Sequence, residues 1–253
     1  MQVYERKVLR ISGTDVADFL QGLVSNDVAK LRDGLVYAAL LTPQGKLRAD
    51  FFLVPDGEDI LLDANARMAK QLVSVLGMYR LRAAIEISET DIPVSRGTGT
   101  LPDGAFADPR LPELGWRGYA GQAGDETDWE ALRVRHCVPE SGIELHEETY
   151  ILEAGFERLH GVDFRKGCYV GQEVTARMKH KTTLRKGLAR VTVTRQAPVG
   201  TPITRDGKNV GVLYTQSGGQ AIAHLRLDRA GPDMMAGTAR VAYSGSRAIA
   251  LGG

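Results

Sequence analysis

A cysteine between two glycines is the most chemically distinctive feature of the sequence. Residues 165–173 read RKGCYVGQE, and a helix is expected over about 172–181. A cysteine just before a helix N-terminus feels the positive end of the helix dipole, and Arg165 and Lys166 add positive charge nearby. These effects favour the thiolate, which is the reactive form, over the thiol. The segment therefore predicts a reactive thiol at Cys168, tuned by Lys166.

The residues around the thiol could shape a ligand-binding loop. Gly167 and Gly171 permit positive φ and the close approach of a ligand. Glu173 and Arg177 lie four residues apart, in the order that favours an ion pair along a helix. The alternative is a buried Cys168 that behaves as a small apolar side chain. From the residues alone, both interpretations stay open.

A block of positive charge follows the thiol. Between Val174 and Thr204 the sequence has no acidic residue. The basic residues there are Arg177, Lys179, Lys181, Arg185, Lys186, Arg190 and Arg195. Such a block at 177–195 could attract an anionic ligand or make a weak RNA contact, although it lacks aromatic residues on which single-stranded bases could stack. The alternative is a solvated face whose carboxylate partners lie elsewhere in the sequence.

The elements that must hold these residues begin with an antiparallel meander. Strands are expected over residues 3–11, 35–42, 47–54, 60–62 and 83–87. Between the first two, apolar residues at helical spacing predict a helix with one apolar face: Val16, Phe19, Leu20 and Leu23. Asn65 is expected to cap a second helix that ends near Gly77.

The second half of the sequence is more irregular. Residues 93–125 are rich in Gly, Pro and Asp, so irregular connections and short strands are expected there. Asp128 opens a helix that Pro139 stops, and Cys137 is expected to be buried at this helix. From Lys186 onward, short strands punctuated by Gly and Pro predict a small β-barrel or sandwich.

Composition narrows the class of protein. The chain has 253 residues, of which 43% are hydrophobic and 25% charged, and its net charge is +1. These values are typical of a soluble globular protein and give no global field that selects nucleic acid or membrane. Nothing resembles a signal peptide or a membrane span. Two cysteines suit a reducing compartment, and five histidines without HxxxH or HExxH spacing predict no metal site. We therefore expect a cytoplasmic protein without a membrane contact.

Four stretches resemble one known family. Residues 166–173, followed by Arg177, resemble the K-G-C-Y-x-G-Q-E-x-x-x-R signature of YgfZ-type proteins, which include mitochondrial factors that help to assemble four-iron clusters. Residues 19–27 resemble the family's F-L-Q-G-x-x-[ST]-N-D segment, and residues 40–46 resemble its L-L-T-P-Q-G-K turn. Residues 108–110 resemble a D-P-R segment of its bacterial members.

The resemblance, which covers about residues 1–195, implies a fold and a role. The implied α+β fold is that of the glycine cleavage T-protein, with two α+β subdomains built on antiparallel sheets and a C-terminal β-barrel around a central folate-binding channel. The expected subdomains are 1–40 with 108–184, then 41–107, and the barrel at 185–253. The implied cofactor is tetrahydrofolate or a one-carbon-substituted tetrahydrofolate. The implied role is to support the assembly or repair of iron–sulfur client proteins, including enzymes that modify tRNA.

The resemblance also implies residues of the folate site. Residues 152–155, LEAG, resemble the T-protein segment whose glutamate holds the pterin, and a carboxylate can accept two parallel N–H bonds from an aminopyrimidine edge. Glu153 is therefore the expected pterin anchor. The other expected folate contacts are Asn26, Gly167, Tyr169, Gly171, Gln172, Glu173 and Arg177. Cys168 would act as a reactive thiol or share a cluster with another protein or a small thiol, because one cysteine cannot hold a cluster alone.

A second hypothesis is a folate-dependent aminomethyl- or methyltransferase. T-proteins carry an Asp-Asp pair after the Q-G turn, and one of these aspartates assists one-carbon transfer. The aligned residues here are Ala49 and Asp50. If the essential member falls on Asp50, this residue is the catalytic group; if it falls on Ala49, transfer is lost. T-proteins lack the motif around Cys168, so the cysteine favours the YgfZ branch.

Overall fold

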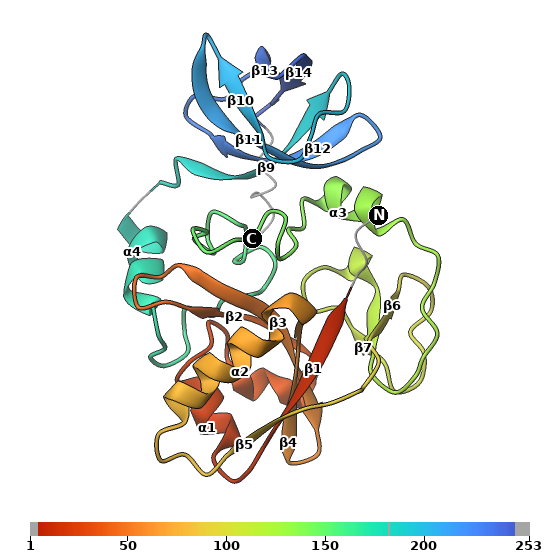
Figure 1. The fold of residues 1–253 in the computed structure, drawn as a ribbon, viewed down its shortest axis with the longest axis vertical. Helices are drawn as coiled ribbons and strands as arrows, with labels where there is room; N and C mark the ends of the chain where they lie inside the picture. Colours follow the sequence, from red (N-terminus) through yellow and green to blue (C-terminus); the bar gives the residue numbers. More distant parts are fainter. Residues whose placement is uncertain (1–4, 182, 246–253) are drawn as a thin grey trace. The chain divides into compact units, whose positions relative to one another are not determined.

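The computed structural model describes residues 5–181 and 183–245, and the chain divides into two compact units. The first unit is formed by Met1–Thr127 and Leu159–Gln172, and the second by Asp128–Arg158 and Glu173–Gly253. Figure 1 labels the main helices and strands along the chain. No helix in the described residues is both long enough and apolar enough to cross a membrane.

The first unit is built on a five-stranded antiparallel sheet in the order β2–β3–β4–β1–β5. Its strands are β1 (Arg6–Ser12), β2 (Val36–Leu41), β3 (Leu47–Asp56), β4 (Asp59–Asn65) and β5 (Glu86–Glu89). Strand β2 is buried along its whole length, because both faces of the sheet are covered. That double coverage explains why β2 reads as a continuous apolar run rather than as an alternating one.

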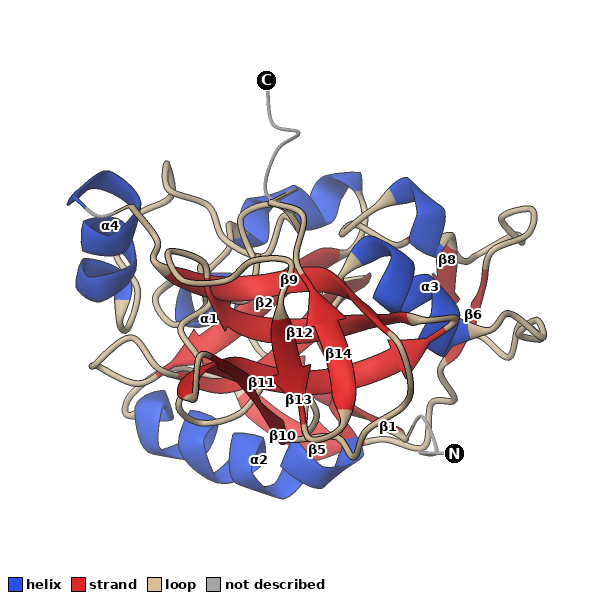
Figure 2. Cartoon of the chain, turned by 90° about the horizontal axis from the view of Figure 1, so that it is seen from above, coloured by secondary structure: helices blue, strands red, loops and turns tan. Residues whose placement is uncertain are grey.

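One face of the sheet carries the apolar core of this unit. Helices α1 (Val16–Gln21) and α2 (Ala66–Arg80) and the short 3-10 helix η1 (Val28–Asp33) bring apolar side chains to it. The fully buried members of the core are Leu9, Ile11, Leu20, Val24, Ala38, Leu40, Phe51, Leu53, Leu62, Ala64 and Leu76. Figure 2 shows α2 running alongside the strands of the sheet.

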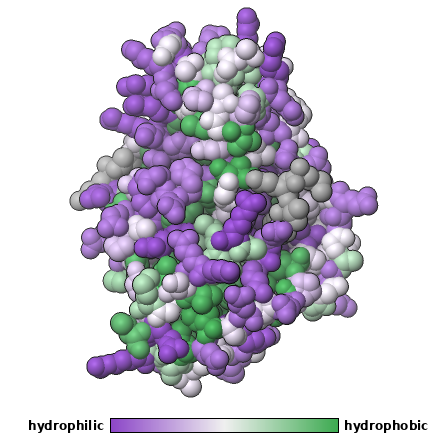
Figure 3. Space-filling model, viewed as in Figure 1, coloured by the Kyte–Doolittle hydropathy of each residue, from purple (hydrophilic) through white to green (hydrophobic). Residues whose placement is uncertain are grey.

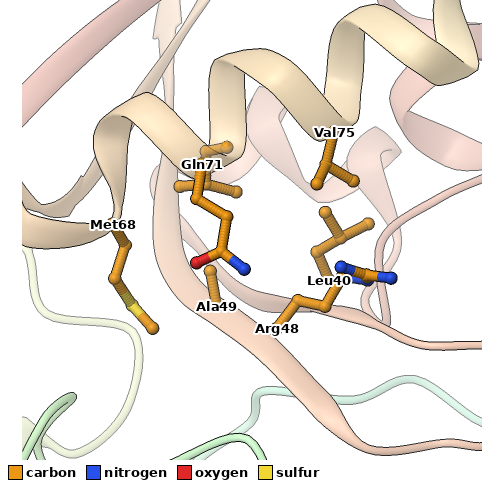
Figure 4. A pocket seen from close by; sticks show the side chains of 7 residues that line it. Leu40, Arg48, Ala49, Met68, Gln71 and Val75 are labelled. Atoms are coloured by element: carbon orange, nitrogen blue, oxygen red, sulfur yellow. The ribbon is translucent and has the colours of Figure 1, made fainter.

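A β-bulge sits where β2 meets the start of β3. Leu40 pairs with Ala49 but Leu41 pairs with Leu47, so Arg48 is the extra residue. A bulge of this kind turns two successive side chains to one face, and Figure 4 shows Arg48 and Ala49 together beneath α2. The hollow that they line there is too narrow to admit a water molecule. Ligand pockets for cofactor-sized molecules measure roughly 300–1,000 Å³, so this hollow does not fit a folate.

The opposite face of the sheet carries a buried charged cluster instead of an apolar core. Asp63 on β4 is fully buried, and its carboxylate accepts hydrogen bonds from Arg6 (2.6 Å), Arg117 (3.0 Å) and the Tyr119 hydroxyl (2.9 Å). Arg117 is 2% exposed and bonds Asp108 as well, at 3.3 Å. Each buried charge in this group therefore faces an opposite charge, which is the condition for burying it at acceptable cost.

An aromatic ring lies among the guanidinium groups of this cluster. The guanidinium carbons of Arg6, Arg110 and Arg117 lie 5.7, 4.9 and 3.8 Å from the centre of the Phe52 ring. Arg110 also makes two hydrogen bonds to Asp108. The Asp-Pro-Arg stretch is thus a structural element that fastens the connection 93–125 to the sheet.

This connection forms a small sheet of its own, in the order β6–β8–β7. Its elements are β6 (Ser95–Gly97), β7 (Phe106–Ala107), the 3-10 helix η2 (Pro112–Leu114) and β8 (Trp116–Gly118). The short strands in irregular surroundings that the composition predicted are confirmed.

The second unit contains helix α3 (Trp129–His136), most of helix α4 (Gln172–Lys181) and a closed barrel in the order β10–β11–β12–β9–β14–β13. The barrel strands are β9 (Lys186–Val193), β10 (Thr201–Arg205), β11 (Lys208–Ser217), β12 (Gln220–Arg226), β13 (Met234–Ala236) and β14 (Ala239–Ala242). Apolar side chains fill its interior, including Val191, Ile203, Leu213, Leu225 and Val241. Hydrophilic side chains are prominent around the barrel on the face shown in Figure 3.

The expected α+β class, with antiparallel sheets and a C-terminal barrel, is confirmed. The expected end of the second helix at Gly77 is wrong, because α2 continues to Arg80. Gly77 is exposed with open space around it, and Tyr79 beyond it still packs on the core, so the packing outweighs the low helix propensity of one glycine. The subdomain boundary expected between residues 40 and 41 lies inside strand β2, which pairs with β3. The expected division into subdomains stays a prediction.

Replacing Asp63 with Ala should destabilise the protein strongly. The substitution leaves the buried guanidiniums of Arg6 and Arg117 without this carboxylate, and removing one partner of a buried ion pair costs about 3–5 kcal/mol. Urea unfolding would measure the loss. Glu89→Ala is the control, since its exposed pair with Lys7 should contribute little. Equal effects of the two substitutions would contradict the view that the cluster holds the first unit together.

Candidate functional site

The thiol of Cys168 is exposed, in the segment that leads into α4. Gly167 beside it is also exposed, whereas the next residue, Tyr169, is buried at 9% exposure. The alternative of a buried, apolar Cys168 is therefore wrong. An exposed sulfur can meet a reagent, a partner or a cluster without any opening of the fold, so the segment 163–172 (the thiol loop) is the candidate site of the first unit.

Lys166 holds the thiol loop to the end of α1. Its ammonium donates hydrogen bonds to the carbonyl oxygens of Gln21, at 2.7 Å, and of Val24, which are groups that a helix end leaves unpaired. It also lies 4.9 Å from the centre of the Tyr169 ring. Burial lowers the pKa of this ammonium to about 8, although the negative charge of Asp27 opposes the shift. Lys166 thus acts as an anchor, and its tuning of the thiol stays a prediction.

Asp163 shapes the start of the thiol loop. Its Oδ1 accepts hydrogen bonds from the backbone N–H groups of Arg165 (2.7 Å) and Lys166 (3.2 Å), and its Oδ2 pairs with Lys30 at 2.6 Å. Its own N–H donates to the Ser25 carbonyl at 3.0 Å. The backbone before the cysteine is therefore bonded on two sides to residues 25–30.

The two glycines of the motif have different roles. Gly171 has a φ of +82°, and a Cβ there would lie 2.5 Å from the Thr42 carbonyl oxygen and 3.2 Å from the Cα of Gly45. Any side chain would displace the loop from the turn at 41–45, so glycine is required. Gly167 does not lie in the left-handed region and has open space around it. Positive φ therefore explains Gly171 and not Gly167.

Asn26 belongs to the framework beneath the loop. Its Nδ2 donates to the carbonyl oxygens of Tyr37 (2.8 Å) and His160 (2.6 Å), and its Oδ1 accepts from the Asp27 N–H and the Lys30 ammonium, both at 2.9 Å. An amide offers two donors and two acceptors, so all four positions are filled. At 3% exposure, Asn26 has no hydrogen-bonding group left for the folate contact that the resemblance implies.

The remaining residues of the motif lie at the start of α4. Gln172 accepts a hydrogen bond from the Tyr169 N–H through Oε1 at 3.2 Å, which closes the turn into the helix. Glu173 and Arg177 are both exposed and do not pair with each other, so the expected ion pair is wrong. Exposed side chains at this spacing gain little from holding one geometry. The folate contacts expected of Tyr169, Gln172, Glu173 and Arg177 stay predictions.

Three of the four family-like stretches thus meet at one place. The thiol loop contacts residues 19–27 through Lys166 and Asp163, and it contacts residues 40–46 through Gly171. Segments far apart in the sequence build one rigid support, and the side chain that this support leaves exposed beside Gly167 is Cys168.

Asp50, the candidate for transfer chemistry, lies on the charged face of the sheet. It is 6% exposed, and its Oδ2 accepts a hydrogen bond from the Tyr37 hydroxyl at 3.0 Å. Burial and the Asp50 charge raise the pKa of Tyr37 well above its usual value. Ala49 points the other way, into the apolar core. Of the two aligned positions, only Asp50 therefore presents a polar side chain to a polar environment.

Glu153 belongs to the second unit and sits in a capped turn. Gly155 has a φ of +79°, and its N–H donates to the Leu152 carbonyl while the Phe156 N–H donates to the Ile151 carbonyl. This pair of bonds is the Schellman pattern, in which glycine takes the left-handed position. The LEAG segment therefore has a structural reason for its glycine, and it places Glu153 on the last turn.

The carboxylate of Glu153 pairs with a histidine that the sequence did not single out. Oε2 of Glu153 lies 3.2 Å from Nε2 of His224, and the two side chains are 19% and 32% exposed. A lone histidine gives no signal in the sequence, and the proximity depends on the pairing of β12 with β9. The carboxylate stays partly exposed, as a pterin anchor must be.

Part of the basic block has partners elsewhere in the second unit. Lys179 pairs with Glu157, and Arg190 donates to the Arg135 carbonyl at 2.9 Å. Arg185, Lys186 and Arg195 are exposed, and the side chain of Lys181 lies outside the described residues. For these members the RNA contact stays a prediction.

Cys137 is buried, whereas Cys168 is exposed. Cys137 caps the end of α3 with a φ of +51°, and its burial is as expected. Burial raises the pKa of its thiol to about 12. Across residues 5–181 and 183–245, no three His, Cys, Asp or Glu side chains gather where they could hold a metal ion.

Comparison with known proteins finds a matching family for the barrel and a solved structure with a similar fold. Residues 185–250 match the family described as CAF17, C-terminal beta-barrel domain. The structure resembles the glycine cleavage system aminomethyltransferase T from Bartonella henselae, with a TM-score of 0.74 and 14% identity over 94% of this chain and 82% of that one. This likeness confirms the expected T-protein fold. The central folate-binding channel stays a prediction.

The proteins of similar sequence are named as iron–sulfur cluster assembly factors. A protein of Mycosarcoma maydis named iron–sulfur cluster assembly factor IBA57 homolog, mitochondrial, is 34% identical over 73% of this chain and 55% of its own length. The human iron–sulfur cluster assembly factor IBA57, mitochondrial, is 29% identical over 87% of this chain and 75% of its own. The chain is therefore similar in sequence to IBA57-type iron–sulfur cluster assembly factors. It spans about half the length of the fungal relatives.

The names of these relatives correct the expected location and narrow the expected family relationship. The IBA57-type relatives are named mitochondrial, which contradicts the cytoplasmic location expected from the sequence. The expected similarity to iron–sulfur assembly factors is confirmed for proteins of the IBA57 type, and the closer identity with YgfZ proteins stays a prediction.

Native alkylation should modify one of the two thiols. Iodoacetamide should label Cys168, which is exposed, and leave Cys137, whose burial raises its pKa to about 12. Mass spectrometry of the native and the urea-unfolded protein would count the labels. Cys168→Ser should take up no label until it unfolds. Labelling of Cys137 in the native protein would contradict the assignment.

Lys166→Met should remove a pH dependence of stability. In the folded chain the Lys166 ammonium loses its proton near pH 8. In the unfolded chain the same group keeps its proton up to about pH 10.5. Between these values the unfolded state binds more protons, so the free energy of unfolding should rise with pH in the wild type. The variant should lack this rise and be less stable at pH 7 by roughly 1–3 kcal/mol, because two carbonyls lose their donor. Urea unfolding from pH 7 to 10 would measure both effects. If the free energy of unfolding changed with pH equally in the wild type and the variant, the prediction would be contradicted.

Proposed function

We propose that this protein supports the assembly or repair of iron–sulfur enzymes and binds tetrahydrofolate, or a one-carbon-substituted tetrahydrofolate, while doing so. The observation that carries the proposal is the exposed thiol of Cys168 on a support built from three family-like stretches. The similarity to proteins named iron–sulfur cluster assembly factors points to the same role. Clients in this proposal include enzymes that modify tRNA, as the resemblance implies.

The thiol would act on the cluster as a shared ligand or a reactive group. A four-iron cluster needs about four ligands, and Cys168 is one. The other ligands would come from the client protein or from a small thiol, and the cluster would be cargo rather than a resident group. Because the sulfur is exposed, a partner can reach it without unfolding the loop.

The carboxylate of Glu153 has the chemistry needed to bind a pterin. A carboxylate that is partly exposed can accept two N–H bonds from the aminopyrimidine edge. Oε2 of Glu153 is bonded to His224, and among the described residues Oε1 has no hydrogen-bond partner. Bound folate would supply a one-carbon carrier at this place. The protein's own part is to hold the ring through Glu153.

Loss of Cys168 should abolish the biological function without unfolding the protein. Cells that lack their own IBA57-type protein would be complemented with the wild type, Cys168→Ser or Cys137→Ala, and the activity of a four-iron enzyme would be measured. We expect Cys168→Ser to fail and Cys137→Ala to complement. Equal complementation by all three would overturn the role of the thiol.

Tetrahydrofolate should bind the wild type and bind Glu153→Gln more weakly. Glutamine loses the charge and one acceptor, and a hydrogen bond to a charged group contributes about 1.5–3 kcal/mol, or roughly tenfold to a hundredfold in affinity. Anaerobic calorimetric titration would measure the affinity. If the protein instead made methylene-tetrahydrofolate from an aminomethylated lipoyl carrier, and this turnover survived Cys168→Ser but not Asp50→Ala, the transferase hypothesis would replace the proposal.

A further inference from the structure

Glu153, in the turn at 151–156, and His224, on barrel strand β12, form an isolated pair. Their side chains meet at 3.2 Å, between Oε2 and Nε2. In the described part of the chain, neither side chain has another hydrogen-bond or ion-pair partner. Both are partly exposed, at 19% and 32%, so the pair is open to solvent and to a ligand. A partly exposed pair of this kind contributes little to stability, so its geometry needs another explanation.

The fold fixes both members of the pair through one strand. The carbonyl oxygen of Glu153 accepts a hydrogen bond from the N–H of Leu188 on β9 at 2.8 Å. In the sheet register, Leu188 is the residue directly opposite His224 on β12. The backbone of Glu153 and the ring of His224 are therefore set by neighbouring positions of the same strand pair.

A glycine lets the turn approach this strand closely. A Cβ on Gly187 would lie 3.2 Å from the carbonyl oxygen of Glu153 and 3.9 Å from its Cα. This contact is tighter than most Cβ atoms make, so a larger residue at 187 would require the turn to move by a few tenths of an ångström. Glycine at 187 therefore accommodates the close approach of the Glu153 turn to β9.

We infer that His224 is a positioning residue for the carboxylate of Glu153, an inference that rests on the proposed folate binding. A glutamate side chain has several rotatable bonds, and a ligand that orders it must offset the lost entropy. His224 orders it before the ligand arrives by holding Oε2, while Oε1 and the remaining lone pairs stay available. Pre-ordering of a binding group raises affinity without a new contact to the ligand. The bond also sets which ring nitrogen of His224 carries the proton.

A double-mutant cycle tests the inference. Anaerobic titration with tetrahydrofolate would compare the wild type, His224→Ala, Glu153→Gln and the double variant. We expect His224→Ala to weaken binding about tenfold in the wild-type background and less than about twofold in the Glu153→Gln background, because the two residues act as one unit. His146→Ala, at an exposed histidine of the same unit, is the control and should bind like the wild type.

A conservative variant separates positioning from folding. His224→Gln keeps an N–H donor near the place of Nε2, so it should restore affinity to within about threefold of the wild type. Nitrogen NMR of the histidine rings gives a readout without ligand: the His224 resonances should shift in Glu153→Gln, because the ring loses its charged partner.

The outcomes separate the inference from the proposed function. Normal binding by His224→Ala together with a large loss in Glu153→Gln would overturn the positioning role and leave folate binding standing. No binding by the wild type would overturn both folate binding and the inference. Unchanged His224 resonances in Glu153→Gln would overturn the pair itself, whatever the affinities.

Discussion

The ammonium of Lys166 is the interaction on which the thiol loop depends. It donates to the carbonyls of Gln21 and Val24 at the end of α1, where a helix leaves acceptors without partners. The bond stabilises two things at once, since it completes the helix end and fastens the loop 142 residues or more further along the chain. Gly171 fastens the other end by fitting against the turn at 41–45. Between these two fixed points the chain has little freedom, and it presents Cys168 outward.

Several residues of the family-like stretches make internal contacts that hold the framework together. Asn26 has all its hydrogen-bonding groups filled, Asp108 is bonded to buried guanidiniums, and Gly155 takes a left-handed turn that other residues resist. Cys168 is exposed and Glu153 is partly exposed, so these two side chains stay accessible.

The sequence predicts well whatever depends on local chemistry. The meander of β2, β3 and β4, helix α4 and the barrel strands follow from periodicity and from turn residues, and the expected burial of Cys137 is confirmed. It predicts poorly whatever depends on distant partners. The continuation of α2 past Gly77 needs the core contact of Tyr79, and the pair of Glu153 and His224 needs the register of β9 with β12. The predicted ion pair between Glu173 and Arg177 fails for the opposite reason. Their spacing on the helix favours a pair, but both side chains are exposed to water, which weakens the attraction between them.

The two thiols show how environment decides the chemistry open to this protein. Cys137 is as nucleophilic in principle as Cys168, but burial holds its pKa near 12 and keeps it from any partner. One accessible sulfur cannot enclose a cluster, and it cannot form a disulfide with a thiol that stays buried. The ligand field of any cluster that Cys168 touches must therefore be completed from outside the chain. In the proposed function this makes the protein a participant in cluster transfer or repair, acting together with a client, rather than a container for the cluster.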